Sequence, residues 1–237
     1  MTNLAILDRP MYALSEAARL LELPPATLRR WLEGFTVRGV PYQAVIRLSD
    51  RNSSDVTWAE FIEAGYLREY RVKGTVSLQR LRRFIDLARE SWGVPYPLAH
   101  FKPLVGERRD LLIRLKQLQD EAQLDDDLQP VRLVDPETGQ LAFSAGFKEF
   151  LNKVQFSDGV ATSMHPLGSS IPVVIHPDVA FGVPQVHGIR TETIAEAIAT
   201  GEDHESVAAT YGLSIPDVRA AIQWELQLRP RPRSEAA

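Results

Sequence analysis

The sequence predicts a mainly α-helical protein with small β elements, an α+β fold built from several parts. Three observations lead to this prediction. Apolar residues recur at helical spacing along most of the chain, apolar-polar alternation flanks a turn at 131–143, and Pro and Gly clusters divide the helical stretches. We expect a first domain at residues 1–95, a connecting α+β region at 96–170, a helical domain at 171–228 and a disordered basic tail at 229–237.

Residues 12–34 are predicted to form two short amphipathic helices that meet at a Pro-Pro turn. Ser15 is the expected N-cap of the first helix. Pro24 cannot continue that helix, whereas Pro25 suits the first position of the next one, where an amide would be unpaired anyway. Gly34 is the expected C-cap of the second helix. The apolar stripes are Ala17, Leu20 and Leu21 in the first helix and Leu28, Trp31 and Leu32 in the second.

The second of these helices turns Thr27, Arg29 and Arg30 outward. Two short helices with a tight turn and basic residues on the second match the helix-turn-helix pattern, whose second helix enters the DNA major groove. An ordinary helical hairpin with a solvated arginine face is the alternative. The residues predicted to contact DNA are Thr27, Arg29, Arg30, Arg19, Arg38 and Arg47.

A small β element and two longer helices complete the predicted first domain. Tyr42, Val45, Ile46 and Leu48 indicate short strands of a wing, followed by a polar loop at 50–55. One helix is capped by Thr57 and runs to about Tyr70, and the next is capped by Ser77. This order of elements resembles the MerR-like DNA-binding domain, in which such a helix can also contact DNA phosphates. A solvated surface explains the arginines on the outer face of that last helix equally well. They are Arg80, Arg82, Arg83 and Arg89.

The charge is distributed unevenly along the chain. Residues 1–100 hold 14 Lys and Arg against 11 Asp and Glu, a balance of +3, whereas residues 101–237 hold 13 against 20, a balance of −7. The part with the candidate DNA reader is therefore the basic part. Contacts to phosphates near the docking helix set the affinity, so a specific DNA-binding module works in a chain with a net charge of −4.

The rest of the chain predicts a boundary at residues 92–97, a β-hairpin at 131–143, a short helix at 147–154 and three C-terminal helices. The first of the three runs from about Thr191 to Thr200, and the second begins at Asp203. Gly212 makes the turn, and Ser214 with Asp217 forms a capping box for the third. Its expected inward residues are Ile215, Val218, Ile222 and Leu226. Its expected outward residues are Asp217, Arg219, Ala220, Gln223 and Gln227.

These three helices have the spacing of a second helix-turn-helix, but their outward face carries little positive charge. Dimerisation or partner binding fits them at least as well as DNA binding.

Enzyme chemistry is not indicated, because the chain has no cysteine, no paired histidines, no phosphate-binding glycine loop and no nucleophile elbow. We therefore expect no metal, no cofactor and no catalytic residue. Without a secretion signal or a run of 18 apolar residues, a cytoplasmic protein is expected.

Two stretches resemble known families. The sequence SEAARLL, followed by a Pro turn and TLRRWL, is similar to the N-terminal helix-turn-helix of MerR-like regulators and excisionases. Motifs from residue 175 to residue 214 resemble a small bacterial domain of unknown function that is often encoded beside PIN-domain ribonucleases. The motifs are Ile175-His176-Pro177, Phe181-Gly182-Val183-Pro184, His187-Gly188-Ile189-Arg190, Gly201, Val207-Ala208 and Tyr211-Gly212-Leu213-Ser214.

A longer form of that domain, with an N-terminal MerR-like helix-turn-helix, resembles the chain over nearly its whole length and is placed among VapB-type antitoxins. The resemblance implies a homodimer that represses its own operator and neutralises a PIN-type, VapC-like ribonuclease. Most VapB antitoxins are much shorter, so the resemblance does not locate the toxin-binding surface. A MerR-like regulator without a toxin and a protein-interaction scaffold are the alternative functions.

The basic tail is one candidate for contact with the toxin. Its three arginines, spaced by prolines, have the charge to pair with the carboxylates that hold Mg²⁺ in a PIN domain. An unconstrained terminus is the alternative, because short endings rich in Pro and Arg commonly lack order. The candidate residues are Arg229, Arg231 and Arg233.

Overall fold

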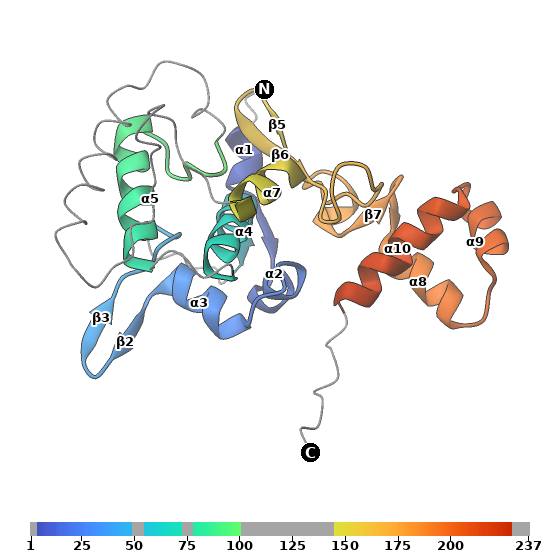
Figure 1. Ribbon diagram of the computed structural model, residues 1–237, viewed down its shortest axis with the longest axis horizontal. Helices are drawn as coiled ribbons and strands as arrows, with labels where there is room; N and C mark the ends of the chain where they lie inside the picture. The colour runs from blue at the N-terminus through green and yellow to red at the C-terminus, as the bar shows by residue number, and fades with distance from the viewer. Residues whose placement is uncertain (1–3, 49–54, 73–77, 101–144, 229–237) are drawn as a thin grey trace. The chain divides into compact units, whose positions relative to one another are not determined.

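The computed structural model describes residues 4–48, 55–72, 78–100 and 145–228 (Figure 1). These residues divide into two compact units, Met1–Leu151 with Phe156–Ala161, and Asn152–Gln155 with Thr162–Ala237. Helices predominate and the strands form small two-stranded sheets, which confirms the predicted mainly α fold with small β elements. The predicted hairpin at 131–143, the cap at Ser77 and the tail at 229–237 lie outside the described residues.

The first unit begins with a short helix and a strand that the sequence did not predict. These are α1 (Leu4–Leu7) and β1 (Pro10–Tyr12), and β1 pairs antiparallel with β4 (Val56–Thr57). The other elements of this unit are α2 (Leu14–Leu20), α3 (Pro25–Glu33), β2 (Phe35–Val37), β3 (Val40–Tyr42), α4 (Trp58–Val72), α5 (Leu78–Trp92) and α7 (Ala145–Lys153).

Helix α4 is the centre of the first unit. Nearly all its residues from Trp58 to Glu69 are buried, including the carboxylates of Glu60 and Glu63. The predicted cap at Thr57 is confirmed as a capping box. The Glu60 amide donates to Thr57 Oγ1 at 3.3 Å, and the Thr57 amide donates to Glu60 Oε2 at 3.0 Å. A helix buried on every side must receive partners for its charged groups from neighbouring segments.

Helix α7 and residues 96–100 pack on α4 in the same unit. The Phe150 ring lies 4.7 Å from the Tyr66 ring and so close to Gly65 that an added Cβ would stand 2.0 Å from it. The Trp58 indole donates to the Ala161 carbonyl at 2.8 Å, and the Ala161 amide donates to Ala99 at 2.9 Å. The predicted domain boundary near residue 95 therefore differs from the division of the structure, because residues beyond it complete this core.

The start of α2 differs from the prediction. The helix begins at Leu14, and its N-cap is Ala13, which makes no side-chain capping bond, so the predicted cap at Ser15 is wrong. The helix ends where Glu22 takes a left-handed φ of 48° and the Leu23 amide donates to the Ala18 carbonyl at 2.8 Å. The predicted apolar stripes of α2 and α3 are all buried, as expected.

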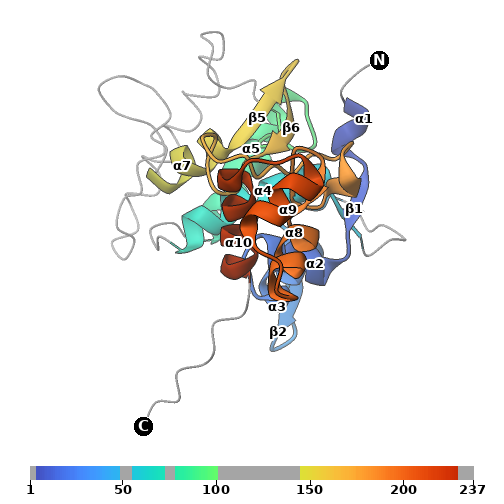
Figure 2. The same ribbon diagram turned by 90° about the vertical axis from the view of Figure 1, so that its right-hand side faces the viewer.

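After α7, the strands β5 (Val154–Ser157) and β6 (Val160–Met164) pair to form a hairpin. The second unit then contains a short 3₁₀ turn and a two-stranded sheet. Its three helices are labelled in Figure 2. These elements are η1 (Ala180–Gly182), β7 (Gln185–Val186), β8 (Ile189–Arg190), α8 (Thr191–Ala199), α9 (His204–Tyr211) and α10 (Ile215–Leu228).

The local capping predictions for α9 and α10 are confirmed. Asp203 accepts from the Ser206 amide at 2.7 Å, and Gly212 adopts the left-handed conformation. Ser214 and Asp217 form the predicted capping box. The inward face of α10 was predicted less well, because Leu226 is exposed whereas Ala220 is buried. Within the described residues, no helix has the length and apolar character needed to cross a membrane.

Candidate nucleic-acid interface

Burial of the apolar face of helix α3 turns its polar face outward. Leu28, Trp31 and Leu32 are buried, and the helix packs against α2 and α4. Pro25 occupies the first helical position and the Gly34 amide donates to the Arg30 carbonyl at 3.1 Å, so both predicted ends of this helix are confirmed. Arg29 and Arg30 are exposed on the opposite face, and Thr27 is half-buried.

A β-hairpin follows α3 directly. Strands β2 and β3 pair antiparallel, with Val37 opposite Val40. Arg38 and Gly39 form the two-residue turn and have φ values of 49° and 80°, as a type I′ hairpin turn requires. Val37, Arg38 and Val40 are exposed at its tip.

Tyr42, which the sequence placed in a wing strand, ends β3, but the other predicted strand residues lie beyond the hairpin. Val45 and Ile46, which the sequence placed in a strand, are buried, and their amides both donate to the Trp31 carbonyl, at 2.9 and 3.0 Å. The segment after the hairpin therefore binds the end of α3 instead of extending the sheet. Leu48 is exposed and likewise lies outside any strand.

The hairpin is fixed to the end of α3 at its base. The Arg30 guanidinium lies 5.5 Å from the centroid of the Phe35 ring, and Phe35 stacks on Tyr42 at 4.8 Å. A Cβ on Gly34 would stand 2.4 Å from the Tyr42 carbonyl oxygen, and Gly34 has a φ of 77°. Helix α3 and the hairpin thus form one continuous surface, which we call the α3–hairpin surface. Its exposed basic residues are Arg29, Arg30 and Arg38.

Arg19, the predicted contact on α2, is exposed but paired. Its guanidinium donates to both carboxylate oxygens of Glu16, at 2.8 and 2.9 Å. This pair spans one turn of the helix and lies at the surface, where such pairs contribute little to stability. Arg19 therefore offers a partly neutralised charge beside the α3–hairpin surface.

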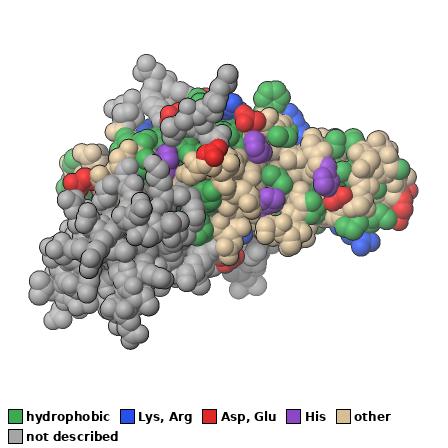
Figure 3. Space-filling view, turned by 90° about the horizontal axis from the view of Figure 1, so that it is seen from above, with side chains coloured by type: hydrophobic (Ala, Val, Ile, Leu, Met, Phe, Trp, Pro, Cys, Tyr) green, Lys and Arg blue, Asp and Glu red, His purple; other side chains and the backbone are tan. Residues whose placement is uncertain are grey.

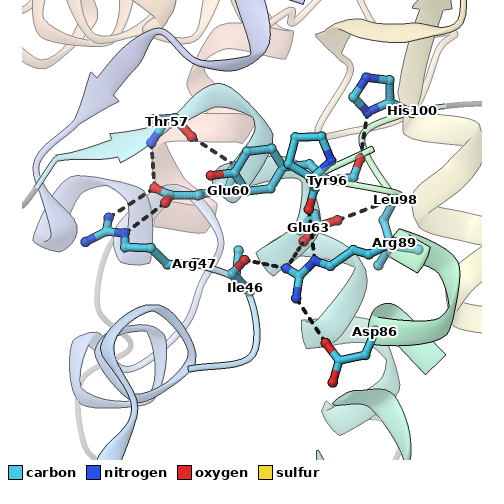
Figure 4. A network of polar contacts seen from close by, with 11 residues as sticks. Ile46, Arg47, Thr57, Glu60, Glu63, Asp86, Arg89, Tyr96, Leu98 and His100 are labelled. Carbon is cyan, nitrogen blue, oxygen red and sulfur yellow. Dashed lines mark hydrogen bonds and ion pairs between the residues drawn. The ribbon is translucent and has the colours of Figure 1, made fainter. Parts of the chain in front are cut away.

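Arg47, the last predicted DNA contact, points into the core instead (Figure 4). It makes two hydrogen bonds to the buried carboxylate of Glu60, at 2.8 and 3.1 Å, and a third to the Asp55 carbonyl at 3.1 Å. The hydrogen bond to Glu60 raises the pKa of Arg47. We correct the prediction for Arg47: its charge neutralises a carboxylate of α4 and is buried away from any DNA.

A second buried carboxylate on α4 is held by α5 and by the segment after it (Figure 4). Glu63 accepts from the Leu98 amide at 3.1 Å and lies 3.8 Å from the Arg89 guanidinium. Burial raises the pKa of Glu63 to about 8, and this outweighs the opposing effects of Arg89 and the Leu98 amide. The folded protein therefore keeps a proton on Glu63 at pH values where the unfolded chain releases it.

Two arginines of α5 hold the segment that follows the hairpin. Arg89 donates to the carbonyls of Ile46 at 2.5 Å and Pro95 at 2.9 Å, and Arg82 donates to the Gln43 carbonyl. For these two residues, the structure gives a positioning role that the sequence did not predict. The spacing of residues in the sequence does not predict this positioning role, because the acceptors are main-chain carbonyls about 40 residues away or in a turn.

The second unit is acidic. Its described residues, 152–155 and 162–228, include 3 Lys and Arg and 8 Asp and Glu, a balance of −5. Among the described side chains on the face shown in Figure 3, the basic ones are few and scattered. Among the described residues of the whole chain, no group of three or more His, Asp or Glu has the geometry to hold a metal ion. The candidate nucleic-acid interface is therefore the α3–hairpin surface of the first unit.

Comparison with known proteins places the chain in a family. Residues 173–224 match a family described as "Protein of unknown function (DUF433)". "Uncharacterized protein Rv2308" of Mycobacterium tuberculosis is 30% identical over 233 residues, a match that covers 97% of this chain and 95% of Rv2308. The chain belongs to the same family as Rv2308.

Two other proteins match the chain over most of its length. "Putative antitoxin VapB45" of M. tuberculosis is 28% identical over 227 residues, covering 91% of this chain and 93% of VapB45. The crystal structure of Rv2018 from the same organism superposes with a TM-score of 0.71 at 27% identity, covering 91% of this chain and 99% of Rv2018. The match to VapB45 supports the predicted likeness to an antitoxin, and the MerR-like character of the first domain stays a prediction.

Removing the Arg47 side chain should destabilise the protein. We expect Arg47→Ala to lower the free energy of unfolding by about 3–5 kcal/mol, because it leaves the Glu60 carboxylate buried without its partner. Arg29→Ala is the matched control and should change it by no more than about 0.5 kcal/mol, because Arg29 is exposed. Urea titration of both variants measures the difference. Wild-type stability in Arg47→Ala would show that the pair is unimportant to the fold.

The raised pKa of Glu63 predicts a pH dependence of stability. Between about pH 4.5 and pH 8 the unfolded chain loses a proton that the folded chain keeps, so stability is fully present below this window and falls as pH rises through it. The Glu63→Gln variant lacks this pH-dependent loss of stability, so it should gain stability relative to the wild type from pH 5 to pH 8.

Urea unfolding at several pH values measures this difference. Glu90→Gln, which removes an exposed carboxyl from α5, serves as the control and should follow the wild-type pH profile. Parallel profiles of the wild type and Glu63→Gln would contradict the assignment of the titrating group to Glu63.

Proposed function

We propose that the chain is the antitoxin of a type II toxin–antitoxin pair, which neutralises a PIN-type ribonuclease and represses its own operon by binding DNA. The match to a protein named "Putative antitoxin VapB45" over 91% of the chain carries the proposal. The α3–hairpin surface supports the DNA-binding part. The match to the family described as of unknown function covers the C-terminal unit and is consistent with the same assignment.

In this proposal α3 is the recognition helix. The buried apolar face of α3 leaves Arg29 and Arg30 on the side that would face the major groove. Thr27 lies in the first turn of α3, where main-chain amides favour a phosphate. Arg38 at the tip of the hairpin would reach the neighbouring backbone or minor groove, and Arg19 would add a weaker contact. Arg47 has no part in this surface.

A homodimer is part of the proposal for a quantitative reason. The α3–hairpin surface offers only three exposed arginines, and affinity for DNA scales with the number of phosphates that a protein neutralises. Two copies on a palindromic operator double these contacts and fix their spacing at one helical turn of DNA or a multiple of it.

The toxin-binding part of the proposal requires an element that keeps RNA from the acidic, Mg²⁺-dependent site of the nuclease. The arginines at 229, 231 and 233 remain candidates by their charge, although they lie outside the described residues. A MerR-like regulator without a toxin is the second candidate function, since the α3–hairpin surface supports it equally. The two differ only in whether the chain binds a nuclease.

Replacing both arginines of the recognition helix should weaken DNA binding. We expect Arg29→Ala with Arg30→Ala to lower affinity for the upstream DNA in a mobility-shift assay. The slope of log K against log salt should become shallower by about 2, because two phosphate contacts are lost. Arg219→Ala is the matched control, an exposed arginine on α10 that should leave both quantities unchanged. An unchanged affinity and slope in the double variant would remove α3 from the interface.

Co-expression with the product of the adjacent gene tests the antitoxin function. We expect the two proteins to co-purify through a tag on either one, and the ribonuclease activity of the partner to appear only when this chain is removed. Separate elution of a folded, active nuclease would reject the antitoxin proposal and favour the regulator. Failure of the chain to shift its upstream DNA would reject the DNA-binding role in both.

A further inference from the structure

The second unit contains a loop at residues 176–183 whose flanking segments are joined by hydrogen bonds. We call it the Phe181 loop. At its base the main chains of Val174 and Gln185 exchange two hydrogen bonds, both 2.9 Å long. Within the loop, the Val179 amide donates to the His176 carbonyl and the Gly182 amide to the Val179 carbonyl, both at 3.0 Å. These bonds make the loop a preorganised protrusion.

The tip of this loop presents an aromatic side chain to solvent. Phe181 is 84% exposed and Val179 is 36% exposed. Ala180, Phe181 and Gly182 all have left-handed φ values, of 50°, 57° and 75°. A left-handed conformation is costly for residues with a Cβ, and a bulky residue adopts it rarely. Phe181 therefore combines an unfavourable backbone conformation with a ring that the fold does not bury.

The ring contributes little to the stability of the isolated chain, because apolar side chains stabilise a fold only when they leave water. Glycine at position 181 would relieve the backbone strain at no cost in buried area. A rigidly held, exposed aromatic ring has the character of an interface anchor, since such rings fill pockets of a partner and dominate binding energy. The loop is thus built for contact with another molecule.

The charge of the unit indicates the chemistry of that molecule. The described residues of the second unit carry 3 basic and 8 acidic side chains, and exposed Asp178 lies in the Phe181 loop itself. An acidic surface attracts a basic one and repels nucleic acid. A ribonuclease must present Lys and Arg to bind the phosphates of RNA, so its RNA-binding surface is complementary to this unit.

We propose that the Phe181 loop anchors the second unit on an apolar pocket at the basic, RNA-binding surface of the ribonuclease partner. This inference rests on the proposed antitoxin function and names the surface that carries it. Phe181 fills the pocket and the acidic residues of the unit pair with the Lys and Arg around it. Docking at this place excludes RNA from the same basic residues, and inhibition requires no contact with the catalytic metal.

The test is the affinity of the full-length chain for the purified ribonuclease from the adjacent gene, measured by titration calorimetry. Phe181→Gly should weaken binding on the order of tenfold or more, as loss of an anchor residue does. Its melting temperature should stay unchanged or rise, because strain is relieved. A structural role of Phe181 would instead lower the melting temperature.

Two controls locate the effect. Leu48→Ala removes a 57% exposed apolar side chain from the first unit and should leave affinity for the ribonuclease unchanged. A chain truncated after Leu228 should also keep its affinity, since the anchor lies in the Phe181 loop and not in the tail. Higher salt should weaken binding of the wild type, in keeping with the proposed charge complementarity.

The outcomes separate this inference from the function on which it rests. If the unchanged chain binds the ribonuclease and Phe181→Gly binds equally well, the anchor is refuted and the antitoxin function stands. If the unchanged chain does not bind, both are refuted. If Phe181→Gly converts a dimer of the chain alone into a monomer, the ring serves self-association and the proposed anchor is wrong.

Discussion

The structure of the first unit depends on two carboxylates that are completely buried along one helix. Glu60 and Glu63 lie on the face of α4 that the rest of the unit covers, and a buried carboxylate is costly unless it is paired or protonated. The two carboxylates are stabilised in different ways. Glu60 receives two hydrogen bonds from Arg47, whereas Glu63 has a main-chain amide, a more distant guanidinium at 3.8 Å and a raised pKa. These contacts draw the segment after the hairpin and the segment after α5 onto α4.

This constraint separates the arginines of the first unit into two groups. Arg47, Arg82 and Arg89 face inward or bind main-chain carbonyls, and they fix the segment that supports the end of α3. Arg29 and Arg30 are exposed because the opposite face of α3 is apolar and buried. The proposed DNA contacts thus rest on arginines that the core does not use. Loss of an inward arginine would affect DNA binding only through the fold.

The two units differ in charge and in the kind of surface that they present. The first offers a small basic surface made of a helix and a hairpin, and the second offers an acidic surface with an exposed aromatic ring on a rigid loop. A protein that binds DNA and a basic nuclease needs both, since one surface cannot complement partners of opposite charge. In the proposed function each unit binds one class of partner.

The sequence by itself determined the features that depend on neighbours within one helical turn. The helices, the cap at Thr57, the capping box at Ser214 and the apolar stripes of α2 and α3 follow from spacing of three and four residues, and they are observed. Only the tertiary structure decided which arginine is buried, where the hairpin strands lie and which apolar side chains stay exposed. The bond from Arg47 to Glu60 spans 13 residues, and Phe181 and Leu226 are exposed because no described segment packs over them. Such outcomes depend on how distant segments meet, which local periodicity does not encode.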